Sequence, residues 1–158
     1  MTKVLRRRRF EAKTDYRSRL DLLKSSFPRL IIRKTNRQII VQIIESKDAQ
    51  DKVLFSAASK DLLTQGWPKD LAGSLKSKPA AYLTGYLLAK RAVGKTKKAI
   101  LDTGLNRNVK KSRLYSALKG VIDGGIEIPH KEDVLPSDEE LSSNVKVGSL
   151  INKLKAKI

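Results

Sequence analysis

Hydrophobic side chains recur at a loose helical spacing in residues 1–28, inside an otherwise polar and basic segment. The apolar positions of this series are Phe10, Tyr16, Leu20, Leu23 and Phe27. Pro28 ends the pattern, because proline cannot continue a helix. The pattern predicts a basic N-terminal arm with a helical middle.

Short runs rich in Ile, Leu and Val follow the arm and predict three β-strands at residues 29–34, 38–44 and 53–57. The segment 35–37 between the first two runs is short enough for a hairpin, whereas residues 45–52 form a longer polar turn. Three strands in direct succession predict an antiparallel meander.

Residues 59–78 are predicted to form a long loop with little regular structure, because they hold Gly66, Pro68 and Gly73. Loops of this length are uncommon in compact domains and are often functional. Trp67, the only tryptophan, lies inside this loop. We favour its interpretation as a hydrophobic plug that fixes the loop to the core, and the alternative is stacking on a nucleic-acid base.

Helices and strands alternate in the second half of the chain. Helices are predicted at residues 79–93 and 112–123, and short strands at 99–101 and 126–128. Small residues at Ala81, Gly85 and Ala89 would allow the first helix to approach a sheet closely. This alternation implies parallel pairing. The fold class is therefore α/β, with a mixed sheet of about five strands.

The last segment, residues 131–158, is predicted to be a tail with an amphipathic helix. Ser137 and Glu140 have the spacing of a capping box at a helix start. The apolar residues Val147, Leu150, Ile151, Leu154 and Ile158 then recur at helical intervals. This helix packs either on the body formed by residues 29–130 or on a partner, and the sequence leaves both open.

Composition is compatible with one folded domain of 158 residues, since 40% of the side chains are hydrophobic. The chain has no cysteine, so disulfides and thiolate metal sites are excluded. No apolar stretch approaches the roughly 20 residues that a membrane helix needs. We expect no secretory signal, because arginines follow the first residues in place of an apolar segment, and we favour an intracellular protein.

Charge changes this picture most, because the formal net charge is +18 and the pI is about 10.3. Residues 1–37 carry 13 basic and 3 acidic side chains, and residues 94–119 carry 8 basic and 1 acidic. Two basic blocks therefore hold most of the excess. Such a balance predicts a polyanionic partner, and the run Arg6–Arg9, which points in all directions on a helix, favours nucleic acid over a membrane surface.

Several function classes lack the residues they need. Zinc modules need cysteine, and RNA-recognition sheets need exposed aromatics, which make up only 5% of this chain. The single histidine, His130, is interpreted as a surface or packing residue. A metal-dependent nuclease on a ribonuclease-H-like fold would need converging carboxylates such as Asp102, Glu45 and Asp123. We keep this nuclease and a nonspecific basic nucleic-acid-binding protein as alternatives.

Recognition by charge and shape remains, and it suits folded RNA. The predicted RNA-contacting residues are basic or polar side chains of the arm, of the first strand and hairpin, and of the loop before the second helix. They are Arg6, Arg7, Arg8, Arg9, Lys13, Tyr16, Arg17, Arg19, Arg29, Arg33, Lys34, Asn36, Arg37, Arg107, Asn108, Lys110, Lys111 and Arg113. No catalytic residue, metal or cofactor is predicted.

Five stretches resemble a known family. They are residues 16–24 (YRSRLDLLK), 28–38 (PRLIIRKTNRQ), 79–85 (PAAYLTG) preceded by Trp67, 101–105 (LDTGL) leading to 111–113 (KSR), and 117–130 (ALKGVIDGGIEIPH). In this order they resemble the 5S-rRNA-binding proteins of the large ribosomal subunit, which are large-subunit protein eighteen in prokaryotes and protein five in eukaryotes. The Trp67 segment and the Ile-Pro-His ending are similar to the archaeal type.

The resemblance implies a ribonuclease-H-like, three-layer α/β body without catalysis. It implies a structural ribosomal protein of the cytoplasm that binds 5S rRNA, attaches it to the large subunit at the central protuberance, and contacts 23S rRNA. Neighbouring ribosomal proteins would be its other partners, with no membrane and no small-molecule substrate. The family's basic arm corresponds to residues 6–19, its first strand and turn to 28–36, and its basic loop to 107–113.

Overall fold

A computed structural model of the chain describes residues 4, 6–48, 50–143 and 145–158. Positions 1–3 and 5 of the predicted arm therefore lie outside the described residues. The helices are α1 (Arg7–Phe10), α2 (Tyr16–Leu23), α3 (Leu62–Gln65), α4 (Lys78–Ala92), α5 (Arg113–Asp123), α6 (Asp138–Ser142) and α7 (Val145–Lys157). The strands are β1 (Arg29–Lys34), β2 (Ile39–Lys47), β3 (Gln50–Ala58) and β4 (Ile100–Asp102), and short 3-10 turns occupy Ser59–Asp61, Lys69–Ser74 and Glu132–Val134.

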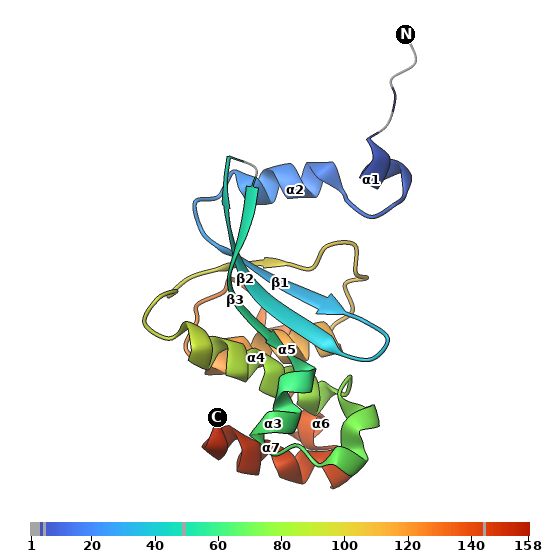
Figure 1. Cartoon of the computed structure of the whole chain (residues 1–158), viewed down its shortest axis with the longest axis vertical. Coiled ribbons are helices and arrows are strands. Elements are labelled where there is room, and N and C mark those ends of the chain that lie inside the picture. The colour runs from blue at the N-terminus through green and yellow to red at the C-terminus, as the bar shows by residue number, and fades with distance from the viewer. Residues whose placement is uncertain (1–3, 5, 49, 144) are drawn as a thin grey trace.

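The four strands form one mixed sheet in the order β3-β2-β1-β4. β2 pairs antiparallel with β1 and β3, which confirms the predicted meander, and β4 pairs parallel with β1. Figure 1 shows α2 on one side of the sheet and α4 and α5 on the other. The prediction of an α/β protein with a mixed sheet is confirmed.

β2 and β3 are longer than predicted. The residues expected to form a polar turn instead continue the ladder as far as the pair Lys47–Gln50, beyond a register shift at Ile43/Ile44. Their polar side chains hide the strand pattern because this part of the ribbon is exposed to solvent. The ribbon extends past the body of the sheet and reaches α2 (Figure 1).

The predicted fifth strand at residues 126–128 is not part of the sheet. This segment makes a single parallel bridge, Lys98–Glu127, with hydrogen bonds from Ala99 N to Glu127 O (3.0 Å) and from Glu127 N to Lys97 O (2.9 Å). Pro129 follows directly and has no N–H to continue a ladder. The prediction of about five strands was therefore too high by this segment.

The predicted irregular loop at residues 59–78 is also wrong, because short helical turns fill most of it. Trp67 is only 2% exposed, and its indole N–H donates to the Leu71 carbonyl at 3.1 Å. The interpretation of Trp67 as a core plug is confirmed, and base stacking by this buried ring is excluded. The sequence shows no helical periodicity here, because each helical turn is too short for a hydrophobic pattern to repeat.

α4 and α5 approach each other closely, and glycine makes this possible. A Cβ at Gly85 would overlap the Ala117 carbonyl oxygen, and a Cβ at Gly120 would overlap the Tyr82 carbonyl oxygen. Ala89 lies in the same way against Gly124. The small residues of α4 were expected to allow close packing on the sheet, but Gly85 and Ala89 instead allow close packing on α5.

The C-terminal tail packs on the body. Leu141, Val147 and Leu154 are buried in the same core as α4 and α5. The Ser137 hydroxyl accepts from Glu140 N at 3.3 Å, which is one half of the predicted capping box, and the Glu140 carboxylate accepts from Lys111 instead of closing the box. Lys155 of α7 donates to the Tyr82 hydroxyl (3.0 Å), which donates to Asp123 (2.7 Å). Burial of the Tyr82 hydroxyl and its bond to Asp123 raise the pKa of Tyr82.

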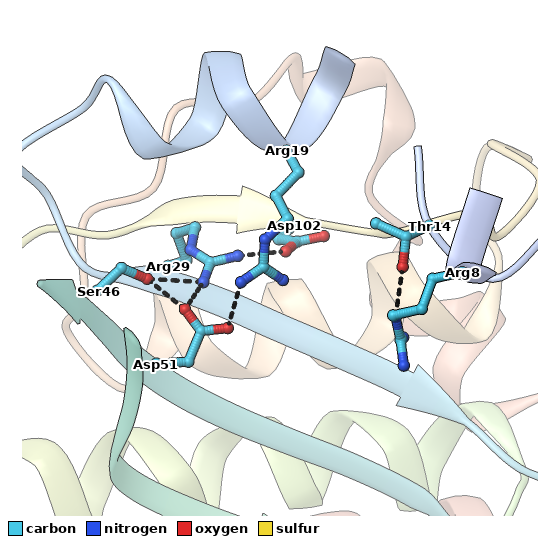
Figure 2. A network of polar contacts seen from close by, with 7 residues as sticks. All are labelled: Arg8, Thr14, Arg19, Arg29, Ser46, Asp51 and Asp102. Carbon is cyan, nitrogen blue, oxygen red and sulfur yellow. Dashed lines mark hydrogen bonds and ion pairs between the residues drawn. The ribbon is translucent and has the colours of Figure 1, made fainter. Parts of the chain in front are cut away.

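Arg29 of β1 is the centre of a polar network that joins all four strands of the sheet and the arm (Figure 2). Its guanidinium, 2% exposed, donates to Asp102 of β4 (3.0 Å), Asp51 of β3 (2.7 Å) and Ser46 of β2 (2.8 Å). Asp51 also pairs with Arg19 of α2 at 2.9 Å. This second contact ties α2 to the end of the β2–β3 ribbon.

We expect Gly85→Ala and Gly120→Ala each to lower the free energy of unfolding by about 1–3 kcal/mol, because the added methyl group must push two backbones apart. Chemical denaturation of the purified variants measures this change. Gly73→Ala is the control, since nothing lies within 4 Å of its Cβ position, and it should be neutral or slightly stabilising. Equal stabilities of all three variants would contradict the close helix contact.

Asp102→Ala is expected to destabilise the protein by about 3 kcal/mol, because it removes one of the two carboxylates that neutralise a buried guanidinium. Glu127→Ala removes the exposed Lys98–Glu127 pair instead and should cost less than about 1 kcal/mol. Thermal unfolding followed by circular dichroism compares the two. A loss for Asp102→Ala no larger than for Glu127→Ala would contradict a structural role of the buried pair.

Asp51 predicts a dependence of stability on pH. Partial burial opposes ionisation of its carboxylate, but the Ser46 hydrogen bond and the charges of Arg29 and Arg19 outweigh burial and lower the pKa of Asp51. A lowered pKa contributes stability that is fully present above the unfolded value, about 4, and is lost as pH falls through the folded value.

The melting-temperature difference between the wild type and Asp51→Asn should therefore be largest at about pH 6 and should shrink below about pH 4. Asp70→Asn is the control, since Asp70 makes none of the ion pairs found among the described residues. A difference that stays constant across this pH range would show that Asp51 stabilises the fold by packing and not by charge.

Candidate RNA-binding surface

The arm consists of two short helices where the sequence predicted one helical pattern. The break is at Ala12, which has φ 49°, and α2 then starts at an N-cap that sequence reasoning missed. The Asp15 carboxylate accepts from Arg17 N (2.9 Å) and Ser18 N (3.3 Å). Hydrogen bonds from Ser18 and then Arg17 lower the pKa of Asp15. An aspartate three residues before a serine was a usable sequence signal.

The arm keeps its cations exposed, since neither α1 nor α2 contains a buried residue. The Arg6 guanidinium lies over the Tyr16 ring at 4.9 Å, and Arg8 donates to the Thr14 hydroxyl at 2.9 Å (Figure 2). Arg7 has only a long contact of 3.9 Å to Glu11. The arm thus presents arginines that are held in place but remain accessible to a phosphate.

A cavity of about 550 Å³ lies between the arm and the sheet. Arg8, Lys13 and Arg19 line it from the arm, and Arg33 lines it from β1. The Arg33 guanidinium lies against Gly104, where φ is 58° and a Cβ would come within 2.5 Å of the Arg33 nitrogen. Asp15, Asp21 and Asp102 also line this cavity, so its charge is mixed.

A separate, smaller cleft of about 340 Å³ is lined by Lys34 and by residues at the starts of α4 and α5. Lys34 at the end of β1 meets Arg107 and Arg113 there, although they are far apart in sequence. Asn36 and Arg37 are exposed at the neighbouring hairpin tip.

Lys78 joins this cleft and was missed by sequence reasoning. It is the first residue of α4, where a cation is opposed by the helix dipole. A lysine in such an unfavourable position was a signal that could have been used.

One predicted contact, Arg29, lies inside the protein and not on its surface. Arg29 is buried and its guanidinium is bound to Asp102 and Asp51, so it is not available to RNA. An arginine that begins a strand looks the same in sequence whether it faces solvent or a buried carboxylate.

Three predicted residues of the basic loop before α5 already have partners in the chain. Lys110 pairs with Asp133 (2.5 Å), Lys111 pairs with Glu140 (2.7 Å), and Asn108 accepts a hydrogen bond from Tyr115. The lysine hydrogen bonds lower the pKa values of Asp133 and Glu140. Both lysines remain exposed, and a phosphate would have to replace the tail carboxylates.

The carboxylates of the nuclease alternative do not form a metal site. Asp102 is held by Arg29 and accepts from Gly104 N at 2.8 Å, Asp123 is bound by Tyr82, and Glu45 lies opposite Lys52 in the ladder. Within residues 6–48, 50–143 and 145–158 there is no cluster of three acidic, histidine or cysteine side chains that could hold a metal. In the same ranges, every helix is too short or too polar to span a membrane.

Comparison with known proteins identifies the family. A family model described as "Ribosomal large subunit proteins 60S L5, and 50S L18" matches residues 2–99 and 93–131. Large ribosomal subunit protein uL18 of Korarchaeum cryptofilum (strain OPF8) is 52% identical over 154 residues, which cover 96% of this chain and 76% of that protein. The uL18 protein of Methanoregula boonei is 42% identical over 156 residues, covering 94% of this chain and 87% of that protein.

These matches extend over nearly the whole chain, and the relatives are archaeal, in agreement with the resemblance drawn from the sequence. They confirm the prediction of a ribosomal protein of the cytoplasm that is not an enzyme, and they remove the nuclease alternative. The chain belongs to the uL18 family of large ribosomal subunit proteins.

Proposed function

We propose that this protein binds 5S rRNA and attaches it to the large subunit at the central protuberance, where the protein also contacts 23S rRNA. The observation that carries the proposal is that cations from segments far apart in the sequence gather in two hollows at the same end of β1 and β4. Arg8 and Arg19 of the arm share a cavity with Arg33, and Lys34 next to it shares a cleft with Arg107 and Arg113.

The chemistry of this surface suits the phosphate backbone of a folded RNA. Guanidinium groups bind phosphate in a bidentate geometry, and they outnumber the lysines among the proposed contacts. Exposed aromatic rings are scarce there, with Tyr16 already under Arg6. We therefore expect recognition through RNA shape and backbone and only a small contribution from base stacking.

The proposed contacts are the predicted ones without Arg29 and with Lys78 added. Those with accessible side chains and no carboxylate within 3.5 Å are Arg6, Arg7, Arg8, Arg9, Arg17, Arg33, Lys34, Arg37, Lys78, Arg107 and Arg113. Lys13, Arg19, Lys110 and Lys111 are proposed as contacts that exchange an internal carboxylate for phosphate. Tyr16, Asn36 and Asn108 are proposed as uncharged contacts.

The finer fold assignment and the division of the chain belong to the same proposal. The strand order β3-β2-β1-β4, with α4 connecting β3 to the parallel strand β4, supports a ribonuclease-H-like body. We propose an arm at residues 1–28, a body at 29–130 and a tail at 131–158. The tail shares the core of the body, so we expect its outer face to meet neighbouring ribosomal proteins.

Competition binding tests the proposed target. The complex of the protein with labelled 5S rRNA, in about 0.15 M salt, should stay intact when an excess of tRNA or of duplex DNA is added. The two competitors are compared at the same nucleotide concentration. If tRNA or duplex DNA displaces the labelled 5S rRNA as well as unlabelled 5S rRNA does, the protein is a nonspecific basic nucleic-acid-binding protein and the proposal fails.

The double variant Arg7→Ala, Arg8→Ala is expected to weaken 5S rRNA binding and to flatten its salt dependence. Each phosphate contact that is lost should reduce the slope of log K against log salt by about 0.7–0.9. The control is Lys60→Ala, Lys69→Ala, which removes two exposed charges outside the proposed surface. Equal slopes for both double variants would show that the arm does not touch RNA.

A further inference from the structure

A second cationic surface lies outside the contacts proposed above. The segment between α4 and β4 contains Lys95, Lys97 and Lys98, all exposed, and it belongs to the second basic block of the sequence. The segment is held firmly, because Thr96 is buried and its N–H donates to the Ala92 carbonyl at 3.2 Å. Lys97 O accepts from Glu127 N on its other side.

The charge of this surface is only partly neutralised within the protein. Lys98 pairs with Glu127 at 2.9 Å, and Lys95 lies over the Phe55 ring at 5.7 Å. Lys95 and Lys97 have no carboxylate within ion-pair distance among the residues that the structure describes. The α4 dipole accounts for cations in its last turn, but Lys97 and Lys98 lie beyond the turn at Gly94.

This surface is separated from the first one by the length of the sheet. β1 and β4 are parallel, so the segment that precedes β4 lies at their start, whereas the hairpin tip and residues 104–111 lie at their end. Six residues of β1 span roughly 16 Å at about 3.3 Å per residue. Figure 1 shows the connection from α4 to β4 and the connection from β4 to α5 at opposite ends of β4.

An apolar groove adjoins Lys98, the last of these lysines. It measures about 440 Å³ and is lined by Phe27, Ala99, Ile100, Ile128 and Pro129, with Lys98 and Glu127 at its rim. The Phe27 ring is 50% exposed, although it is a large apolar side chain next to the sheet. The groove thus joins an open aromatic ring to Lys98, and the unpaired cations Lys95 and Lys97 follow in the same exposed segment. A ring with cations near it can bind an unpaired nucleotide, with the base on the ring and the flanking phosphates on the cations.

We propose that this groove and its lysines form a second RNA-binding site, specific for an unpaired nucleotide within a single-stranded or looped segment. The base stacks on Phe27, and Lys95, Lys97 and Lys98 contact the flanking phosphates. The inference rests on the proposed function in so far as it supposes an RNA partner, but it concerns a separate surface and can be tested without 5S rRNA.

The test uses the full chain and a short single-stranded RNA that contains one 2-aminopurine, whose fluorescence falls when it stacks on an aromatic ring. The wild type should quench the probe. Phe27→Leu, which keeps an apolar side chain in the groove, should abolish the quenching and weaken binding about tenfold. Lys95→Ala, Lys97→Ala should flatten the salt slope by about 0.7 for each lost contact.

Two controls make the result decisive. Lys60→Ala, Lys69→Ala should leave quenching and slope unchanged, and Arg7→Ala, Arg8→Ala should leave the quenching unchanged. Retained quenching in Phe27→Leu, with wild-type 5S rRNA binding, would overturn the second site and leave the proposed function intact. If tRNA or DNA displaces 5S rRNA but quenching still depends on Phe27, the proposed function fails and the second site stands. Displacement of the probe by polyglutamate at equal charge would point to an acidic protein partner and overturn the RNA assignment.

Discussion

The buried guanidinium of Arg29 is the interaction on which the arrangement of the proposed RNA-binding side depends. A single side chain contacts β2, β3 and β4 from its position on β1, and Asp51 extends the network to Arg19 of α2. A charge in this position needs its carboxylates, because an unpaired buried ion is strongly unfavourable. The strands are thereby held together at the end where the arm crosses the sheet, and the arm receives its main ion-pair contact with the sheet.

The protein also has to tolerate a charge of +18 before it meets any partner. Part of the repulsion is removed internally, since acidic residues of the C-terminal segment pair with Lys110, Lys111 and Lys119. The described part of the arm makes four ion pairs of its own, although neither α1 nor α2 contains a buried residue. Internal pairing therefore offsets only part of the charge, and exposed cations without a carboxylate partner remain in the arm, at the hairpin and in the cleft.

The elements with a clear period were predictable, and those set by long-range contacts were not. β1, α4 and α5 lie within about two residues of their predicted bounds because each has its own hydrophobic pattern and recognisable ends. The predicted fifth strand does not join the sheet, because Pro129 interrupts its hydrogen bonding. The ends of β2 and β3 were not predicted, because a ribbon that is exposed to solvent has a polar sequence. At the site, the sequence located the basic segments, but only the fold separated the buried Arg29 from the exposed Arg33 and added Lys78.

Trp67 has a practical consequence. It is the only tryptophan in the chain, it is buried in the core that α4 and the tail share, and no cavity of the RNA-facing surface includes it. Its emission should therefore report on the packing of the core and change little when nucleic acid occupies the proposed surface. The protein thus carries an intrinsic optical probe that separates loss of folding from loss of binding in any variant.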